Sequence, residues 1–382
     1  MSEWPMVKLK ELMRKTKSID PGKYPDEEFA LYSIPAYDNG IPEKIFGRDI
    51  GSSKILLKDS DVVLSKIVPH IRRTWVITDG EKQIGSSEWI VFNDDRFDPQ
   101  FIANYLKSDV FHYQLLTTVA GVGGSLNRAR PAAVAELKIP LPPLGEQKRI
   151  AEILGKTAGA ISSVQKQIEQ AKKLRSSIVG MASKMAVELR AISEYFDINP
   201  RQPRNIPDNA PTSFVPMANL DETFGISPIA SRFSEHKKGY TYFENGDILL
   251  AKITPCFENG KSAIAKLSTQ IGHGSTEFHV LRHKNHMHQD ACLSPLLAAA
   301  ILKQPSFLKP AENFMRGSAG QKRIPVSYIA SLKVPVLKSV DLEKIDQSLE
   351  IVEALLNLYH RKLSLLQELQ KSLATQAFAG LL

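Results

Sequence analysis

The chain has 382 residues, of which 43% are hydrophobic and 24% charged, with a formal net charge of +8. This length exceeds that of one typical domain, so we expect at least two compact units. The excess of Lys and Arg favours a polyanionic partner such as a nucleic acid. No apolar run approaches the roughly 20 residues that a membrane-spanning helix needs, which argues against a membrane protein.

Two features predict a cytoplasmic location. The first five residues, Met1 to Pro5, lack the basic and then apolar order of a signal peptide. Only two cysteines occur, Cys256 and Cys292, which is too few for a disulfide framework and fits a reducing compartment.

The first elements in chain order are predicted to be short strands joined by turns, followed by a helix. Apolar runs at 62–64, 75–77 and 89–92 are separated by clusters of Asp, Gly and Asn, a pattern typical of strands and turns. Residues 101–116 are predicted to form a helix. This stretch is therefore expected to be a mixed domain of strands and helices.

A long amphipathic helix is predicted from 144 to 186, directly after Pro140, Pro142 and Pro143. Its apolar side chains recur at spacings of three and four, which predicts a stripe that needs a helical partner. The predicted seam residues are Ile150, Leu154, Ile161, Val164, Ile168, Leu174 and Ile178.

The second half of the chain then repeats the first half. Residues 61–69 return at 247–255, which is 186 residues later, and residues 137–140 return at 332–335, which is 195 residues later. Between them, Gly85 to Trp89 returns as Gly274 to Phe278, and residues 293–302 are predicted to be a helix. Growing offsets indicate loop insertions between two copies of one fold.

A second long helix, at 339–382, keeps the offset of 195 throughout its length. Its predicted seam residues are Ile345, Leu349, Val352, Leu356, Tyr359, Leu363, Leu366 and Leu373. Because both copies carry the same stripe, we expect the two helices to pair with each other in a coiled-coil-like manner.

These elements predict an α/β fold in which two similar α/β domains alternate with the two long helices. The expected division is 1–143 for the first domain, 144–186 for the first helix, 187–338 for the second domain and 339–382 for the second helix.

Basic loops at matching positions of the two copies, 124–130 and 317–323, are the best candidates for contacts to a polyanion. Arginine can bind a phosphate or both acceptors of a guanine edge, while glycine and serine let backbone amides approach phosphates. The sequence alignment of these loops pairs Arg130 with Arg323. The full set of candidates is Lys66, Arg72, Arg73, Ser125, Asn127, Arg128, Arg130, Lys252, Ser318, Gln321, Lys322 and Arg323.

Motifs for catalysis are sparse in this sequence. There is no P-loop, dinucleotide-binding loop, nucleophile elbow or Asn-Pro-Pro-aromatic motif for amino methylation. Asp208, Glu235 and Lys237 match the loose spacing of a metal-dependent nuclease, which leaves that activity as an alternative. Five histidines cluster near Cys292, at 273, 279, 283, 286 and 288, but they lack a zinc spacing. A solvated, partly basic loop is the favoured interpretation of that cluster, and no metal site is predicted.

Two divergent domains, each closed by a proline-containing junction and a long helix, resemble the specificity subunits of type I restriction-modification systems. The junction at 137–150, Leu-Lys-Ile-Pro-Leu-Pro-Pro-Leu-Gly-Glu-Gln-Lys-Arg-Ile, is the most specific part of the resemblance. Residues 247–250 and 317–324 also resemble that family. The second junction departs from the family pattern, because 335–338 lacks the double proline and 340–344 lacks the Glu-Gln pair.

The resemblance implies a DNA-binding subunit without catalytic residues, in which two target-recognition domains are held apart by two antiparallel helices. Each domain would read one half of a bipartite site in double-stranded DNA. Two methyltransferase subunits would carry S-adenosylmethionine and methylate adenine, and separate restriction subunits would use ATP and Mg²⁺. Besides the nuclease, the remaining alternative is a protein-binding coiled-coil scaffold.

Overall fold

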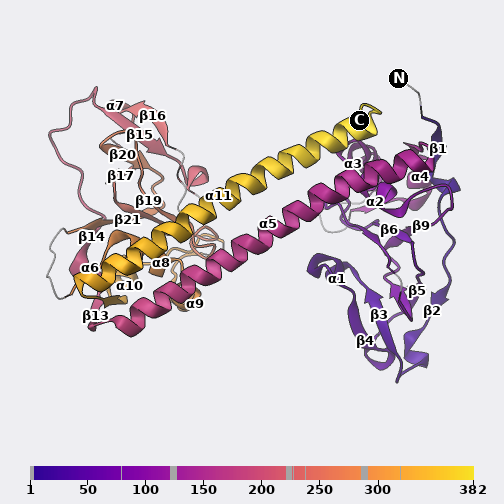
Figure 1. Cartoon of the computed structure of the whole chain (residues 1–382), viewed down its shortest axis with the longest axis horizontal. Helices are drawn as coiled ribbons and strands as arrows, with labels where there is room; N and C mark the ends of the chain where they lie inside the picture. Colours follow the sequence, from indigo (N-terminus) through magenta and orange to yellow (C-terminus); the bar gives the residue numbers. More distant parts are fainter. Residues whose placement is uncertain are drawn as a thin grey trace. The chain divides into compact units, whose positions relative to one another are not determined.

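The computed structural model describes residues 4–78, 80–120, 127–220, 226, 228–236, 238–284, 291–318 and 320–382. The chain divides into two compact units. Unit 1 comprises residues 1–162 and 364–382, and unit 2 comprises residues 163–363. Each unit combines one mixed domain with a part of both long helices (Figure 1).

Unit 1 contains a five-stranded sheet of order β2-β5-β8-β3-β4 and a three-stranded sheet of order β7-β6-β9. Two further strand pairs, β1-β12 and β10-β11, complete its β-structure. The strands are β1 (Met6–Lys8), β2 (Ser18–Ile19), β3 (Glu28–Tyr32), β4 (Glu43–Phe46), β5 (Lys54–Leu56), β6 (Val62–Ser65), β7 (Thr74–Val76), β8 (Gln83–Gly85), β9 (Trp89–Phe92), β10 (Val119–Ala120), β11 (Arg128–Ala129) and β12 (Lys138–Pro140).

Short helices of unit 1 pack against these sheets. They are α1 (Ile34–Asn39), α2 (Pro99–Lys107), α3 (Asp109–Leu116) and α4 (Pro131–Glu136), with 3-10 turns η1 (Leu9–Glu11), η2 (Pro21–Lys23) and η3 (Gly47–Asp49). Helix α2 packs on β6 and β7, and its Phe101 and Tyr105 share a buried cluster with Val62 and Leu64. The strand β6 is buried along its whole length because it is the central strand of its sheet.

The predicted helix 101–116 is corrected by the structure to two helices that meet at Ser108. The Ser108 hydroxyl accepts a hydrogen bond from the Phe111 amide and so caps the start of α3. Helix α2 begins before the predicted start, at Pro99, because the Asp98 side chain caps it by accepting from the Phe101 amide.

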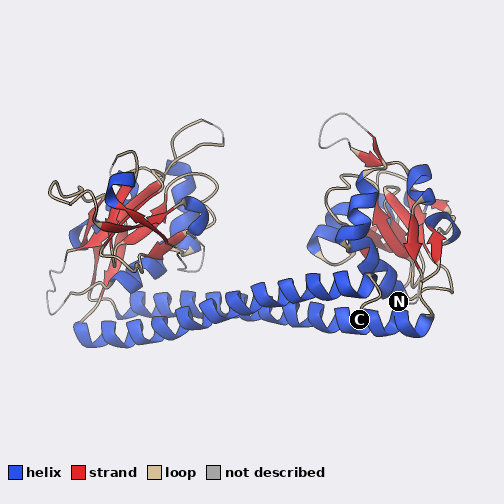
Figure 2. Cartoon of the chain, turned by 90° about the horizontal axis from the view of Figure 1, so that it is seen from above, coloured by secondary structure: helices blue, strands red, loops and turns tan. Residues whose placement is uncertain are grey.

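Unit 2 contains two four-stranded sheets, of order β14-β21-β18-β19 and β16-β15-β20-β17, and the strand pair β13-β22. The strands are β13 (Glu188–Ala191), β14 (Phe196–Ile198), β15 (Pro211–Val215), β16 (Ile229–Arg232), β17 (Thr241–Glu244), β18 (Ile248–Ala251), β19 (Ser262–Ile264), β20 (Ile271–Gly274), β21 (Phe278–His283) and β22 (Lys333–Val336). The helices are α6 (Ile192–Tyr195), α7 (Phe233–His236), α8 (Pro295–Leu302), α9 (Pro305–Ala311) and α10 (Val326–Ala330), with 3-10 turns η5 (Met217–Asn219) and η6 (Glu312–Phe314). Figure 2 shows the strands of each unit gathered between helices and loops.

The strand register of the two units follows the sequence repeat. In unit 1, β6 pairs with β9 so that Val63 lies opposite Val91. In unit 2, β18 pairs with β21 so that Leu249 lies opposite Val280. Each unit also contains one parallel pair, β3 with β8 and β15 with β20. The predicted fold class, two similar α/β domains with long helices, is confirmed.

The two long helices are α5 (Leu144–Met185) and α11 (Ser339–Phe378), drawn in magenta and yellow in Figure 1. Helix α11 ends at Phe378, four residues before the predicted end at 382. In unit 1, Ile150 and Leu154 of α5 share a buried cluster with Leu373 and Ala377 of α11. None of the helices in the described part of the chain is long and apolar enough to cross a membrane.

Candidate nucleic-acid interface

In unit 1, the segment that follows β6 is hydrogen-bonded on both sides. The Lys66 amide donates to the Glu88 carbonyl at 3.0 Å, and the Lys66 carbonyl accepts from the Ala129 amide at 2.8 Å. The Val68 amide donates to the Asn127 carbonyl at 3.0 Å. These bonds join three segments of backbone side by side and so bring residues 66, 88 and 128 close to one another.

Unit 2 repeats this arrangement bond for bond. The Lys252 amide donates to the Glu277 carbonyl, and the Lys252 carbonyl accepts from the Ile324 amide, both at 2.9 Å. The Thr254 amide donates to the Lys322 carbonyl at 2.9 Å. Isolated bridges join Ile67 to Arg128 in unit 1 and Ile253 to Arg323 in unit 2.

This backbone pattern corrects the sequence alignment of the two basic loops. Arg323 corresponds to Arg128, and not to Arg130 as predicted. The alignment followed the shared Gly-Ser letters of the loops, but Gly124 lies four residues before Arg128 whereas Gly317 lies six residues before Arg323. Arg130 instead precedes α4, and its Nε donates to the Thr118 carbonyl at 3.3 Å.

A glutamate faces the arginine in each unit. Arg323 donates from Nε and Nη2 to the two carboxylate oxygens of Glu277, at 2.9 and 2.8 Å. Arg128 makes one longer contact, from Nε to Glu88 Oε2 at 3.4 Å. Hydrogen bonds from Arg323 hold the pKa of Glu277 below its ordinary value, against the opposing effect of its burial, and the charge of Lys252 lowers it further.

Glu88 and Glu277 were not among the residues predicted from sequence. The repeat did contain the signal, because Gly85 to Trp89 and Gly274 to Phe278 both carry the glutamate. Only the fold shows that each glutamate faces the arginine of a loop further along the chain, 40 residues away in unit 1 and 46 residues away in unit 2. We call Lys66, Glu88 and Arg128, and their counterparts Lys252, Glu277 and Arg323, the Lys-Glu-Arg groups.

A buried histidine supports the group in unit 2. The Ile324 carbonyl can only accept a hydrogen bond, so His279 donates to it from Nε2, at 2.9 Å. His279 Nδ1 then accepts from the side-chain Nδ2 of Asn199, at 3.2 Å. Burial lowers the pKa of His279, which fits this neutral state.

The other predicted loop residues of unit 2 lie beside this group. Ser318, Gln321 and Lys322 are exposed, and the Gln321 carbonyl accepts from Arg323 Nη1 at 3.1 Å. In unit 1, Asn127 is half-buried and Arg130 is exposed, while Ser125 lies outside the described residues.

Arg72 and Arg73, also predicted from sequence, do not belong to the Lys-Glu-Arg group. Arg73 is buried and donates to both oxygens of Asp38, at 2.8 and 2.9 Å. This bonding holds the pKa of the Asp38 carboxyl below its usual range. The role of Arg73 in the structure is therefore an internal ion pair.

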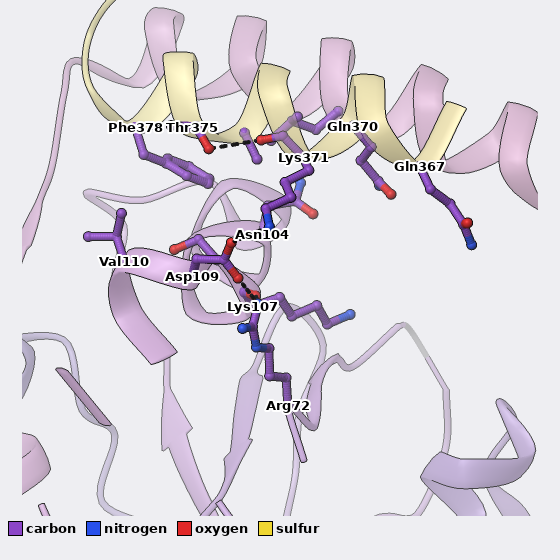
Figure 3. Close-up of a pocket in the computed structure, with 13 residues that line it drawn as sticks. Arg72, Asn104, Lys107, Asp109, Val110, Gln367, Gln370, Lys371, Thr375 and Phe378 are labelled. Carbon is purple, nitrogen blue, oxygen red and sulfur yellow. Dashed lines mark hydrogen bonds and ion pairs between the residues drawn. The ribbon is translucent and has the colours of Figure 1, made fainter. Parts of the chain in front are cut away.

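Arg72 lines a groove of about 350 Å³ between α2, α3 and the end of α11, all within unit 1 (Figure 3). Its Nη1 lies 2.6 Å from Asp109 Oδ1 and donates to the Lys107 carbonyl at 3.1 Å. Lys371 of α11 lies 3.5 Å from the other Asp109 oxygen. The three charges therefore connect the loop after β6 to α3 and α11.

The histidine cluster predicted to be a solvated loop is instead partly buried, which corrects that interpretation. His273 in β20 is fully buried and contacts Thr212 and Gln202, at 3.3 and 3.1 Å. His283 interacts with the Leu293 carbonyl at 3.0 Å, and His286 and His288 lie outside the described residues. The sequence cluster is dispersed because β20 and β21 belong to different sheets.

The nuclease alternative gains no support from the structure. Within the described ranges, no group of three or more His, Cys, Asp or Glu side chains is placed to hold a metal ion. Glu235 Oε2 lies 3.9 Å from His236 Nε2, and Lys237 lies outside the described residues.

The predicted seam residues of the long helices are mostly buried or half-buried, with one exception. Buried are Ile150, Leu154, Val164, Ile168, Ile178, Ile345, Leu349, Val352 and Leu356, and half-buried are Ile161, Tyr359, Leu363, Leu366 and Leu373. Leu174 is 49% exposed and does not belong to the seam. A seam spacing of four and then three residues leads from Ala171 to Arg175 and then to Ile178. Arg175 is buried, and its Nη1 lies 3.5 Å from Oε1 of Glu353 in α11.

The fold and the site together define a class of protein. The chain carries two copies of one mixed domain, each followed by a long helix, and each copy presents the same Lys-Glu-Arg group. Such duplication suits a ligand that offers two similar contact sites.

Comparison with known proteins shows what the first part of the chain is similar to. Residues 1–173 match the model of the type I restriction modification DNA specificity domain. The chain is 41% identical over 147 residues to the EcoEI specificity subunit, a type I restriction enzyme component from Escherichia coli. This match covers 38% of the chain and 24% of the relative. The chain thus spans about a quarter of the length of this relative and of the EcoAI specificity subunit from Escherichia coli, another curated relative.

Solved structures share the fold over nearly the whole chain. The type I restriction-modification S subunit from M. genitalium is 13% identical, covers 98% of this chain and 96% of its own, and has a TM-score of 0.59. A chain from a study of complex assembly and conformational transition of the type I R-M system is 20% identical, covers 100% and 99%, and has a TM-score of 0.52. The predicted resemblance to type I specificity subunits is confirmed.

Proposed function

We propose that the chain is the non-catalytic DNA-reading subunit of a type I restriction-modification enzyme. The mixed domains, at 1–143 and 187–338, would each read one half of a bipartite target in double-stranded DNA. The observation that carries this proposal is the repeated Lys-Glu-Arg group, held in both units by the same backbone hydrogen bonds. Two matched basic surfaces fit a target with two half-sites.

The DNA contacts proposed for each domain are the candidates predicted from sequence, apart from Arg73. In unit 1 they are Lys66, Ser125, Asn127, Arg128 and Arg130, with Arg72 at the neighbouring groove. In unit 2 they are Lys252, Ser318, Gln321, Lys322 and Arg323. We do not retain Arg73 as a contact, because it is buried against Asp38.

The chemistry of such an enzyme would reside on partner subunits. Two methyltransferase subunits would supply S-adenosylmethionine and methylate adenine, and restriction subunits would supply ATP-driven movement and Mg²⁺-dependent cleavage. Support for an assembly of this kind comes from the solved relative whose study concerns assembly of the type I R-M system.

The proposal is tested by co-expressing the chain with a methyltransferase partner and sequencing the methylated positions in host DNA. We expect methylated adenines at one bipartite sequence, present only when both proteins are expressed. Methylation at the same positions without this chain would contradict the proposal.

A salt titration separates DNA reading from the scaffold alternative. The affinity of the purified complex for DNA should fall linearly, on logarithmic axes, with salt, with a slope of about −0.9 for each phosphate contacted. A scaffold that binds only protein would show no DNA affinity that depends on salt in this way.

A further inference from the structure

The guanidinium group of Arg323 is fixed in orientation by three hydrogen bonds. Nε and Nη2 donate to Glu277, and Nη1 donates to the Gln321 carbonyl. An arginine has five N–H donors. Two N–H groups of Arg323, one on Nη1 and one on Nη2, donate to no partner within the described part of the chain. The Arg323 side chain is 42% exposed, which leaves room for a ligand at those two donors.

We infer that Glu277 is a positioning residue that presents the two remaining donors of Arg323 to a guanine in the half-site read by unit 2. This inference rests on the proposed function and goes further by naming the base. Guanine offers two neighbouring acceptors, O6 and N7, in the major groove, and a pair of parallel N–H donors matches them.

The negative charge of Glu277 indicates that this residue contributes to base specificity and not to affinity for DNA in general. A carboxylate close to DNA repels phosphates, so it is unfavourable for general DNA binding. It also occupies the Nε face of Arg323, which a phosphate could otherwise bind. A base edge that fits the two outward donors is then favoured over the phosphate backbone.

The backbone around Glu277 and Arg323 is rigid enough to fix this orientation. Lys252 is hydrogen-bonded to Glu277 on one side and to Ile324 on the other. His279 Nε2 donates a hydrogen bond to the Ile324 carbonyl. The glutamate and the arginine therefore project from neighbouring, hydrogen-bonded stretches of chain.

Unit 1 provides an internal comparison, because its pair is looser. Arg128 makes a single contact of 3.4 Å to Glu88, which fixes its guanidinium less firmly. The position that corresponds to His279 is Ile90, which has no hydrogen-bonding side chain. We therefore expect Glu88 to contribute much less to base discrimination than Glu277.

The experiment measures binding of the complex with its methyltransferase partner to a library of DNA targets randomised within each half-site. We expect Arg323→Lys to lower discrimination at one G·C position of a single half-site by roughly 5- to 150-fold, because lysine keeps the charge but loses the planar pair of donors. Glu277→Gln should relax the same position by about 5- to 10-fold and leave affinity for unrelated DNA equal or higher. In the double variant, Glu277→Gln should add nothing to Arg323→Lys, because the glutamate acts through the arginine.

Two controls accompany these variants. Glu343→Gln removes a carboxylate from an exposed position of α11 and should leave base preference unchanged. Glu88→Gln should change preference in the other half-site by less than about threefold, because its ion pair is longer, at 3.4 Å. Thermal unfolding of each variant shows whether the fold is retained.

Three outcomes would overturn the inference. A Glu277→Gln complex that binds every DNA more tightly with unchanged base preference would show that Glu277 only repels phosphates. Relaxation at a position other than G·C would show that Arg323 does not read guanine. If the unaltered complex has no sequence preference, the proposed function fails as well, and that failure is visible before any variant is made.

Discussion

The two units use the same buried carboxylate but neutralise it with different arginines. Asp61, just before β6, and Asp247, just before β18, are both buried, and each accepts a hydrogen bond from the backbone amide three residues earlier, Lys58 or Glu244. Asp61 is paired with Arg14, which lies between η1 and β2, whereas Asp247 is paired with Arg282 of β21.

This difference teaches that the fold requires the buried carboxylate and a cation to neutralise it, whereas the element that supplies the arginine can differ. A buried ion needs a partner wherever that partner comes from in the sequence. The Lys-Glu-Arg groups also share their backbone hydrogen bonds but differ in their side chains. The contact from arginine Nε to the glutamate is 2.9 Å in unit 2 and 3.4 Å in unit 1.

The largest effect that would sharpen this comparison is expected from Arg282→Met. Breaking the pair leaves Asp247 buried without a cation, which should lower the free energy of unfolding of unit 2 by about 3 to 5 kcal/mol. Arg14→Met should cost unit 1 less, because the Asn93 side chain still donates to Asp61 at 3.0 Å.

Each unit can be followed separately in this experiment. The three tryptophans, Trp4, Trp75 and Trp89, all belong to unit 1, so their fluorescence reports denaturant unfolding of that unit. Amide hydrogen exchange of β18 and β21 reports unit 2. As a control, Asp247→Asn combined with Arg282→Met should recover part of the lost stability. Equal losses for the two single variants would contradict the comparison.

A smaller effect is expected from acid, and it should separate the units. Burial lowers the pKa of His273 from its ordinary value of 6.5 to about 4, whereas the position that corresponds to it in unit 1 is Ile84. The unfolded chain therefore binds a proton at a higher pH than the folded chain, so unit 2 should lose stability as the pH falls from about 6.5 to about 4. The loss amounts to up to about 3 kcal/mol, and unit 1 should show no matching loss from this position.

Hydrogen exchange of β20 and of β8 over this pH range measures the difference, and an NMR titration of His273 measures its pKa directly. His273→Ile, which introduces the residue of unit 1, should remove the part of the acid sensitivity of unit 2 that His273 contributes. A His273 that titrates near 6.5 in the folded chain would contradict this prediction.

The smallest effect is expected where the two long helices differ from the predicted seam. Leu174 and its counterpart 195 residues later, Leu369, are 49% and 46% exposed. Leu174→Ala and Leu369→Ala should each change the free energy of unfolding by less than about 0.5 kcal/mol. Ile178→Ala, one turn further along α5 and buried, is the matched control and should cost about 2 kcal/mol or more. A Leu174→Ala loss as large as that of Ile178→Ala would restore Leu174 to the seam.

Much of the fold could be predicted from the sequence, because it depends on periodicity and duplication. The constant offset of 195 through both long helices predicted α5 and α11, and the repeat of 61–69 at 247–255 predicted that β6 and β18 hold the same place. Such features can be predicted from one sequence, because an apolar stripe or a strand with turns at its ends depends on residues that are close together in the sequence.

The seam shows where this local reasoning fails. Leu174 was predicted to belong to the seam because it lies three residues after Ala171. In the structure Arg175 is buried and Leu174 is exposed to solvent. Hydrophobicity alone chose the wrong residue, because a buried arginine is stable when a glutamate of the other helix, Glu353, faces it.

The sequence by itself thus determined the duplication, the long helices and the candidate loops, all of which are written in neighbouring residues. Only the tertiary structure decided that Arg323 corresponds to Arg128, that Arg73 is committed to Asp38, and that Glu277 faces Arg323. Arg73 and Asp38 are 35 positions apart, and Glu277 and Arg323 are 46 positions apart. The correspondence of Arg323 with Arg128 requires a comparison of two separate hydrogen-bond patterns. Such contacts depend on strand register and loop length, which no local pattern of residues specifies.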